Sequence, residues 1–89
     1  MLYALAFVKA SRYRRNILIY LSENEKTPKE LSIELNIHQN NISATLRGLK
    51  EYNLVYCINP NVKKGRLYKL TDKGYHLVKN LGVFSFSER

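Results

Sequence analysis

A strong helix start near Thr27 constrains the fold of this chain more than any other feature of its sequence. Thr27 is a preferred N-cap residue, Pro28 suits the first helical position, and Glu30 completes a capping box. Leu31 and Leu35 follow one turn apart, which gives the predicted helix an inward face. The chain therefore contains a short helix with a well-defined beginning.

A second helix is predicted after a turn of a few residues. Asn36 tolerates positive φ and suits a left-handed cap at the end of the first helix. Within residues 38–52, Ile42, Leu46 and Leu49 fall at i, i+4 and i+7, which is the apolar stripe of an amphipathic helix. Two short helices joined in this way predict a helix-turn-helix unit.

The outer face of the second helix differs from that of an ordinary solvated helix. It carries short polar groups, one small residue and one cation, namely Asn40, Ser43, Ala44 and Arg47, and its first acid is Glu51. Amide, hydroxyl and guanidinium groups suit base edges and phosphates. We therefore interpret residues 39–52 as a DNA-recognition helix.

Two strands and a last helix are predicted beyond the recognition helix. Residues 54–58 form a β-branched and aromatic run, residues 59–65 contain turn formers and two lysines, and residues 66–70 alternate polar and apolar. This order predicts a β-hairpin with a basic tip. Thr71 is suited to cap a C-terminal helix over residues 72–81.

A helix over residues 12–22, with Ser11 as its cap, completes a predicted three-helix core. Arg12, Arg14 and Arg15 cluster in its first turn, where cations oppose the helix dipole. A phosphate or a partner's carboxylate would compensate this arrangement. Three solvated arginines are the alternative interpretation.

Both ends of the chain carry more apolar residues than a small domain needs. Residues 1–9 suit either a helix or a strand, and they either pack against a partner subunit or cap the core of their own chain. The residues expected to line one face are Leu2, Leu5, Ala6 and Val8. Gly82 is expected to end the last helix, and Phe84 and Phe86 after it suit an edge strand or exchange with a partner. We therefore expect a homodimer through the termini.

The charge of the chain favours an anionic partner. Its 89 residues carry a net charge of +8, which suits nucleic acid or a membrane surface. From His38 to Lys69 six cations stand against one acid; the cations are Arg47, Lys50, Lys63, Lys64, Arg66 and Lys69. No apolar run approaches the roughly 18 residues that span a bilayer, and no basic segment precedes the apolar start as in a signal peptide. We expect double-stranded DNA, and no membrane, as the partner.

The sequence carries no pattern typical of a catalytic or metal site. Cys57 is the only cysteine, so neither an internal disulfide nor a thiolate cluster is expected, and a cytoplasmic location is the natural inference. His38 and His76 have no acidic or histidine neighbour at ligand spacing. There is no glycine-rich phosphate loop and no nucleophile with a partner base. We expect no enzymatic activity, cofactor, metal or small-molecule ligand.

Four segments together resemble the winged helix-turn-helix regulators. They are Thr-Pro-Lys-Glu-Leu-Ser-Ile-Glu-Leu-Asn-Ile at 27–37, Asn-Asn-Ile-Ser-Ala-Thr-Leu-Arg-Gly-Leu at 40–49, Asn-Leu-Val at 53–55 and Gly-Arg-Leu-Tyr-Lys-Leu-Thr-Asp-Lys-Gly at 65–74. Over residues 7–81 the chain is similar to the ArsR-like and MarR-like repressors, especially their compact archaeal relatives. The resemblance implies an α+β fold that is mainly α, with a three-helix core, a β-hairpin wing and a C-terminal helix. We therefore expect one winged helix DNA-binding domain over residues 1–89, with 1–9 and 82–89, whose apolar residues are described above, as candidate dimerisation extensions.

The function implied by the resemblance is that of a sequence-specific transcriptional regulator, usually a homodimer on a pseudo-palindromic site. The recognition helix, residues 39–52, would enter the major groove, and a basic wing, residues 59–66, would reach the flanking backbone or minor groove. The family's recognition positions fall on Gln39, Asn40, Asn41, Ser43, Ala44 and Arg47, and Ser43 matches a hydroxyl that touches phosphate. The wing positions fall on Asn61, Lys63, Lys64 and Arg66, while Thr27, Lys29 and Lys50 are further candidates for backbone contact.

Two positions depart from the family pattern. Ala44 stands where relatives carry a long base-reading side chain, so direct readout would depend on Asn40, Asn41 and Arg47. Gly48 lies inside the helix at a cost of about 0.5–1 kcal/mol relative to Ala, which indicates close approach of another element.

Two other function classes remain open at this point. A winged helix that serves as a protein–protein interaction module of transcription or assembly machinery explains the fold but not the clustered cations. RNA or single-strand binding would need exposed aromatic residues on a sheet for stacking. Tyr56 and Tyr68 are the candidates on the hairpin, although we expect both to pack on the core.

Overall fold

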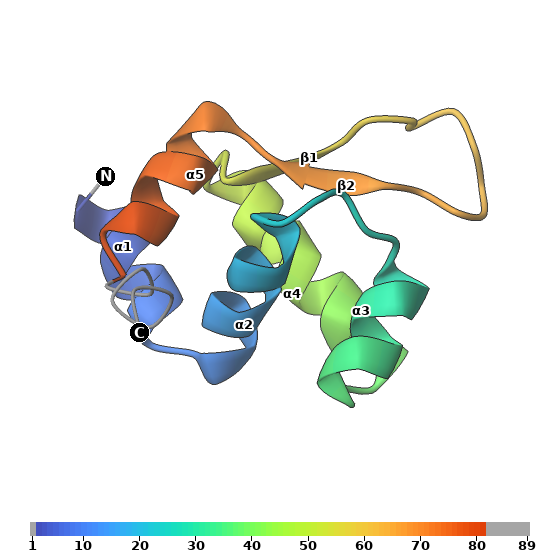
Figure 1. The fold of residues 1–89 in the computed structure, drawn as a ribbon, viewed down its shortest axis with the longest axis horizontal. Helices are drawn as coiled ribbons and strands as arrows, with labels where there is room; N and C mark the ends of the chain where they lie inside the picture. The colour runs from blue at the N-terminus through green and yellow to red at the C-terminus, as the bar shows by residue number, and fades with distance from the viewer. Residues whose placement is uncertain (1, 82–89) are drawn as a thin grey trace.

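The computed structural model describes residues 2–81, which form five helices and one β-hairpin (Figure 1). In chain order the elements are α1 (Leu2–Lys9), α2 (Arg12–Leu21), α3 (Pro28–Leu35), α4 (Gln39–Glu51), β1 (Val55–Cys57), β2 (Tyr68–Leu70) and α5 (Asp72–Lys79). Helices α2, α3 and α4 pack together, and the hairpin extends from them past the start of α3 (Figure 1). The predicted α+β, mainly α, winged helix-turn-helix fold is confirmed.

The beginning and end of α3 follow the predicted chemistry. The Thr27 hydroxyl accepts the Glu30 backbone N–H at 3.1 Å, and the Glu30 carboxylate accepts the Thr27 N–H at 2.8 Å. Asn36 ends the helix with φ 55°, in the left-handed region. These local bonds satisfy backbone groups that a short helix otherwise leaves exposed, and they fix where the turn into α4 begins.

Helix α4 spans Gln39–Glu51, with Tyr52, the predicted last helical residue, as its C-cap. His38 caps its start, since the imidazole Nδ1 accepts the Asn40 backbone N–H at 3.2 Å. Asn53 follows the helix with φ 61°, as expected of a residue that ends a helix in the left-handed region. Ile42 and Leu49 are fully buried and Leu46 nearly so, which confirms the predicted inward stripe.

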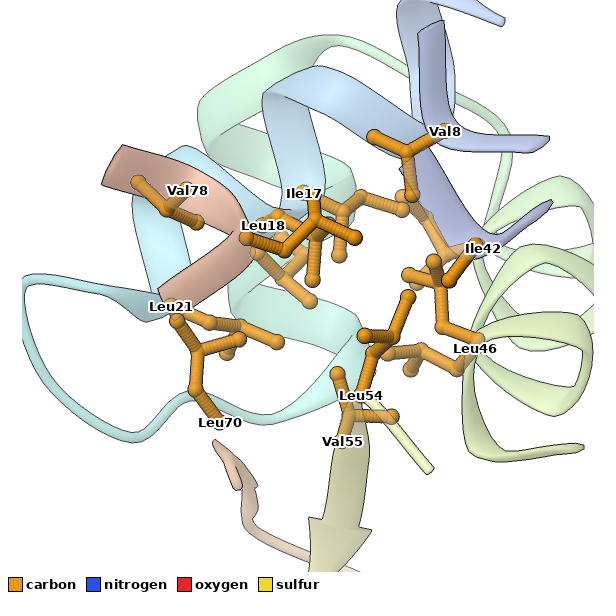
Figure 2. Close-up of a cluster of buried hydrophobic side chains, with 14 of the residues drawn as sticks. Val8, Ile17, Leu18, Leu21, Ile42, Leu46, Leu54, Val55, Leu70 and Val78 are labelled. Atoms are coloured by element: carbon orange, nitrogen blue, oxygen red, sulfur yellow. The ribbon is translucent and has the colours of Figure 1, made fainter. Parts of the chain in front are cut away.

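One apolar core joins all the elements (Figure 2). Figure 2 labels side chains from α1, α2, α4, the hairpin and α5 that converge on a single cluster. The fully buried large residues are Val8, Ile17, Leu18, Leu21, Leu31, Ile42, Leu49, Leu54, Val55, Leu70, Leu77 and Val78. This continuous core fixes α4 relative to the hairpin, so the surface between them has a defined shape.

Helix α1 caps the core of its own chain, which was one of the two alternatives left open for this segment. Ala4 and Val8, one turn apart, are buried. The predicted face was partly right: Val8 is buried and Leu5 packs against the core while half-buried, but Ala6 is exposed and Ala4 was missed. An alanine side chain is small and only weakly hydrophobic, so the residue type at position 4 does not by itself signal burial.

The hairpin strands are shorter than the predicted 54–58 and 66–70. Val55 pairs with Leu70 and Cys57 with Tyr68 in an antiparallel register. Beyond this pairing one further backbone bond forms, from the Ile58 N–H to the Leu67 carbonyl at 2.9 Å. The Asn59 side chain supplies the second bond at this position, because its Oδ1 accepts the Leu67 backbone N–H at 2.7 Å. The wing, residues 59–66, then continues as an irregular loop.

A third backbone segment joins this sheet, which was not predicted from the sequence. The Tyr68 N–H donates to the Lys26 carbonyl at 2.9 Å, and the Lys26 N–H donates to the Tyr68 carbonyl at 3.1 Å. The segment before α3 therefore ties the base of the wing to the start of α3.

Helix α5 ends at Lys79, with Asn80 as its C-cap, and not at the predicted Leu81. Thr71 caps its start as predicted, accepting the Gly74 N–H at 3.0 Å. The predicted dimerisation extension over residues 82–89, with Phe84 and Phe86, lies outside the described residues. None of the helices within residues 2–81 has the length and apolar character needed to cross a membrane.

Candidate nucleic-acid interface

The start of α3, one side of α4 and the wing enclose a groove of about 680 Å³, here called the wing groove. Its lining residues are Thr27, Pro28, Lys29, Gln39, Ser43, Leu46, Arg47, Lys50, Lys63, Lys64, Gly65, Arg66 and Tyr68. The Lys26–Tyr68 backbone pair holds two of its walls together. The groove is thus built into the fold.

The wing groove is strongly basic. Six of its lining residues are cations, and none is an acid; the cations are Lys29, Arg47, Lys50, Lys63, Lys64 and Arg66. All six side chains are exposed. Within residues 2–81 there is one ion pair, between Lys26 and Glu34 at 3.5 Å, and it uses none of these six. A concave surface with one sign of charge concentrates anions near it.

Helix α4 supplies one wall of the wing groove from residues at helical spacing. Gln39, Ser43, Arg47 and Lys50 recur every three or four positions, so their side chains lie along one side of the helix. Leu46, which belongs to the core, lies at the junction of this wall with the interior. The wall therefore offers amide, hydroxyl and cationic groups above an apolar base.

The wing supplies the opposite wall. Gly65 has φ 72°, in the region that glycine adopts most readily, and lies between the exposed cations Lys64 and Arg66. The Arg66 Nε donates to the Val62 carbonyl at 2.7 Å, which uses one of the five guanidinium donors to order the loop. The remaining donors of Arg66 stay available for an anion.

Nine of the thirteen residues predicted as DNA contacts line the wing groove; they are Thr27, Lys29, Gln39, Ser43, Arg47, Lys50, Lys63, Lys64 and Arg66. Asn40, Asn41 and Asn61 are exposed but lie outside its lining, and Ala44 lines a different hollow. Tyr68 also lines the groove and was not among the predicted contacts. Strand alternation places Tyr68 on the same face as Leu70. Its position in the groove depends in addition on the backbone bridge to Lys26, which the sequence does not indicate.

A second, smaller hollow of about 190 Å³ lies on another side of α4 and is here called the Arg14 hollow. It is lined by Phe7, Ser11, Arg14, Ala44, Thr45 and Gly48. A Cβ on Gly48 would lie 3.2 Å from the end of the Phe7 ring, so the close approach predicted from this glycine is made by α1. The Phe7 ring also stacks on Tyr52, with centroids 4.2 Å apart.

Arg14 is held in place at the edge of this hollow. Its guanidinium carbon lies 3.7 Å from the centroid of the Phe7 ring, and its Nη1 donates to the Phe7 carbonyl at 2.8 Å. The arginine cluster at the start of α2 is thus not simply three solvated side chains, since Arg14 is half-buried against α1.

The hairpin does not form an aromatic stacking platform. Tyr56 is 43% exposed, contrary to the expectation that it packs on the core, whereas Tyr68 does pack against the core. Tyr56 pairs with Lys69 and Tyr68 with Cys57, so the two rings point to opposite faces of the hairpin. Stacking of successive bases needs aromatic rings on one face, and this arrangement does not favour single-strand binding.

No group of three or more His, Cys, Asp or Glu residues that could hold a metal occurs within the described part of the chain. Cys57 is a free, half-buried cysteine, and the His38 imidazole caps α4.

A model of the bacterial regulatory protein arsR family matches residues 12–56, from the first residue of α2 into β1. No curated protein sequence matches the chain. The match covers the three-helix core and the beginning of the first strand, and it includes every residue predicted for the recognition helix.

Solved structures of bacterial proteins share the fold. The transcriptional repressor BigR from Xylella fastidiosa superimposes with a TM-score of 0.80 and 26% identity, over 99% of this chain and 86% of BigR. HlyU from Vibrio cholerae gives a TM-score of 0.77 and 25% identity, over 92% and 88% of the two chains. A double mutant of ZitR from Lactococcus lactis in apo form gives 0.75 and 22% identity, over 88% of this chain and 60% of ZitR. The chain therefore spans less than two thirds of ZitR.

Proposed function

The chain belongs to the ArsR family of bacterial regulatory proteins, and from this membership we propose that it is a transcriptional regulator that binds double-stranded DNA in a sequence-specific manner. In this proposal α4 enters the major groove and the wing contacts the flanking backbone or minor groove. The contacting residues are those predicted from the sequence. On α4 they are Gln39, Asn40, Asn41, Ser43, Ala44 and Arg47, and on the wing they are Asn61, Lys63, Lys64 and Arg66. Thr27, Lys29 and Lys50 would contact the sugar–phosphate backbone of the DNA.

The observation that carries the proposal is the charge of the wing groove. Six cations and no acid line one concave surface between α4 and the wing. Binding of these cations to phosphates would release counterions, so affinity is expected to fall steeply as salt rises. A winged helix that only contacts another protein would not need this concentration of positive charge.

The residues on the outer face of α4 would supply sequence selection. Asn40 and Asn41 carry amides, which suit adenine, and Arg47 carries a guanidinium, which suits guanine. Ala44 adds at most contact with a thymine methyl group. Because few side chains read bases directly, DNA shape and a second subunit would contribute to specificity.

We also propose that residues 1–89 act as one domain and that two copies bind a pseudo-palindromic site. Two-fold symmetry in the protein would place two α4 helices about one helical turn of DNA apart, roughly 34–36 Å. The symmetry of selected sites tests this directly, and sedimentation at several protein concentrations tests the dimer independently.

Selection of bound duplexes from a random pool is the experiment that tests the function. We expect enrichment of one motif with inverted symmetry and a steep loss of binding between low and physiological salt. Absence of salt-dependent binding at low ionic strength would contradict the proposal and favour the protein–protein interaction module. Binding without enrichment of a motif would contradict sequence specificity only.

A further inference from the structure

We propose that Arg14 makes a second phosphate contact, on the side of α4 opposite the wing, so that the protein holds both backbones that border one major groove. The inference rests on the proposed function and adds a residue from α2 to it. It concerns the Arg14 hollow, which shares no residue with the wing groove.

The two hollows flank α4. Ser43 and Arg47 line the wing groove, whereas Thr45, which lies between them in sequence, lines the Arg14 hollow. Two residues correspond to about 200° of helical rotation, so Thr45 points away from both. Ala44 is exposed, and around the helix axis it lies between Ser43 and Thr45, on the outer edge of α4. The outer edge of α4 therefore has a basic wall on one side and the Arg14 hollow on the other.

A helix in the major groove has both of its sides near phosphates. The groove is about 12 Å wide and a helix with its side chains is about 10–12 Å across. If the outer edge of α4 faces the base pairs, the wing groove lies by one backbone and the Arg14 hollow by the other. A cation in the Arg14 hollow would therefore bind the second backbone, while the wing groove binds the first.

The Arg14 guanidinium is already held in one position and can bind a phosphate from there. The guanidinium is fixed over the Phe7 ring at 3.7 Å and by its Nη1 bond to the Phe7 carbonyl. These contacts leave four of its five N–H donors for other partners. A guanidinium that is already ordered loses little conformational freedom when it binds an oxyanion.

The surroundings of Arg14 suit an anion as well. The Arg14 hollow contains the hydroxyl-bearing residues Ser11 and Thr45 and no acid. No carboxylate within residues 2–81 forms an ion pair with Arg14. The Arg14 side chain is only half-buried, so a phosphate can reach it. The guanidinium is thus anchored to the protein without being neutralised by the described residues.

A purely structural role for Arg14 makes a different prediction. In that case the bond to the Phe7 carbonyl only fastens α1 to α2, and loss of the arginine would change stability but not the number of phosphates bound. The salt dependence of binding separates the two roles, because its slope reports the number of neutralised phosphates.

The test measures binding of the full chain to one duplex over a range of salt concentrations. Arg14→Gln is expected to lower the slope of log K against log salt by about one, and Arg14→Lys, which keeps the charge, is expected to retain the wild-type slope. Lys79→Ala removes an exposed cation from the end of α5, outside both hollows, and is the matched control. A wild-type slope for Arg14→Gln would overturn the inference.

A second measurement does not depend on the folding of the Arg14 variants. The wild-type protein is bound to duplexes in which single phosphates are replaced by neutral methylphosphonates. We expect two sets of sensitive phosphates, one on each strand across the same major groove. A single set, on the side of the wing only, would overturn the inference and leave the proposed function intact. Failure of the wild-type protein to bind any duplex would instead overturn both.

Discussion

Tyr68 and Lys26 exchange two backbone hydrogen bonds, at 2.9 Å and 3.1 Å, across 42 residues of sequence. This pair makes the segment before α3 a short third member of the hairpin sheet. Thr27, the N-cap of α3 and a residue of the wing groove, follows directly. The distance between the base of the wing and α3 is therefore fixed by the backbone.

The Lys26–Tyr68 pair predicts a pattern of amide hydrogen exchange. The amides of Lys26 and Tyr68 are hydrogen-bonded across the sheet, so we expect them to exchange slowly, near the rate set by global unfolding. The amides of Lys63 and Lys64 lie in the exposed loop and should exchange fast. Nuclear magnetic resonance of the protein in deuterated buffer measures both. Fast exchange at Lys26 and Tyr68 would show that the wing is not held in this way.

The helix caps and the apolar spacing were predictable from the sequence because their causes are local. The capping box of α3 involves residues three positions apart, and the stripe Ile42, Leu46 and Leu49 follows from helical geometry alone. The basic wing was predictable for a related reason, since turn formers and lysines occur together in one short segment.

The Lys26–Tyr68 pair and the buried Ala4 could not be predicted, because both are consequences of tertiary packing. Any backbone can form a bridge, so the identities of Lys26 and Tyr68 carry no signal. The candidate interface likewise contains features that follow from local sequence and features that follow from tertiary packing. Its cations were predictable from charge clustering, whereas the packing of Arg14 against Phe7 required the position of α1.

Gly74 is expected to tolerate no side chain. A Cβ there would lie 2.3 Å from the Leu54 carbonyl oxygen, a backbone atom that also accepts the Thr71 N–H at 3.0 Å. Gly74→Ala should therefore lower the free energy of unfolding by about 1–3 kcal/mol through overpacking. Gly48→Ala is the matched control, because its Cβ meets the end of the Phe7 side chain at 3.2 Å and no backbone atom of another element. Urea unfolding measures both, and equal losses would contradict the role given to the Leu54 carbonyl.

Val8 tests the role of α1 in the core. The side chain is fully buried, so Val8→Ala should lower the free energy of unfolding by about 2 kcal/mol. Tyr3, on the same helix but 83% exposed, is the comparison. Tyr3→Ala should change the stability of the single chain by less than about 0.5 kcal/mol. A stability loss for Tyr3→Ala that grows with protein concentration would instead indicate that α1 contacts a second subunit.

Lys64 is expected to contribute affinity without specificity. It is an exposed cation on the wing, and a single ammonium group bound to phosphate reads no base. Lys64→Ala should weaken binding to the selected site and to random duplexes by the same factor, and lower the salt slope by about one. Lys79→Ala should leave both unchanged. A larger loss on the selected site than on random DNA would assign Lys64 to base readout.

Arg47 is expected to contribute specificity as well as affinity. It lies on the wall of α4 that lines the wing groove, and its planar guanidinium can donate two hydrogen bonds to a guanine edge. Arg47→Ala should weaken binding to the selected site by about 1–3 kcal/mol and relax the preference at one base position.

Arg47→Lys keeps the charge but loses the paired donors, so it should retain most of the binding to random DNA while losing the preference for one base. Repeating the selection with both variants separates charge from base reading. Equal losses on selected and random duplexes for Arg47→Ala would reassign Arg47 to the phosphate backbone and leave Asn40 and Asn41 as the direct readers.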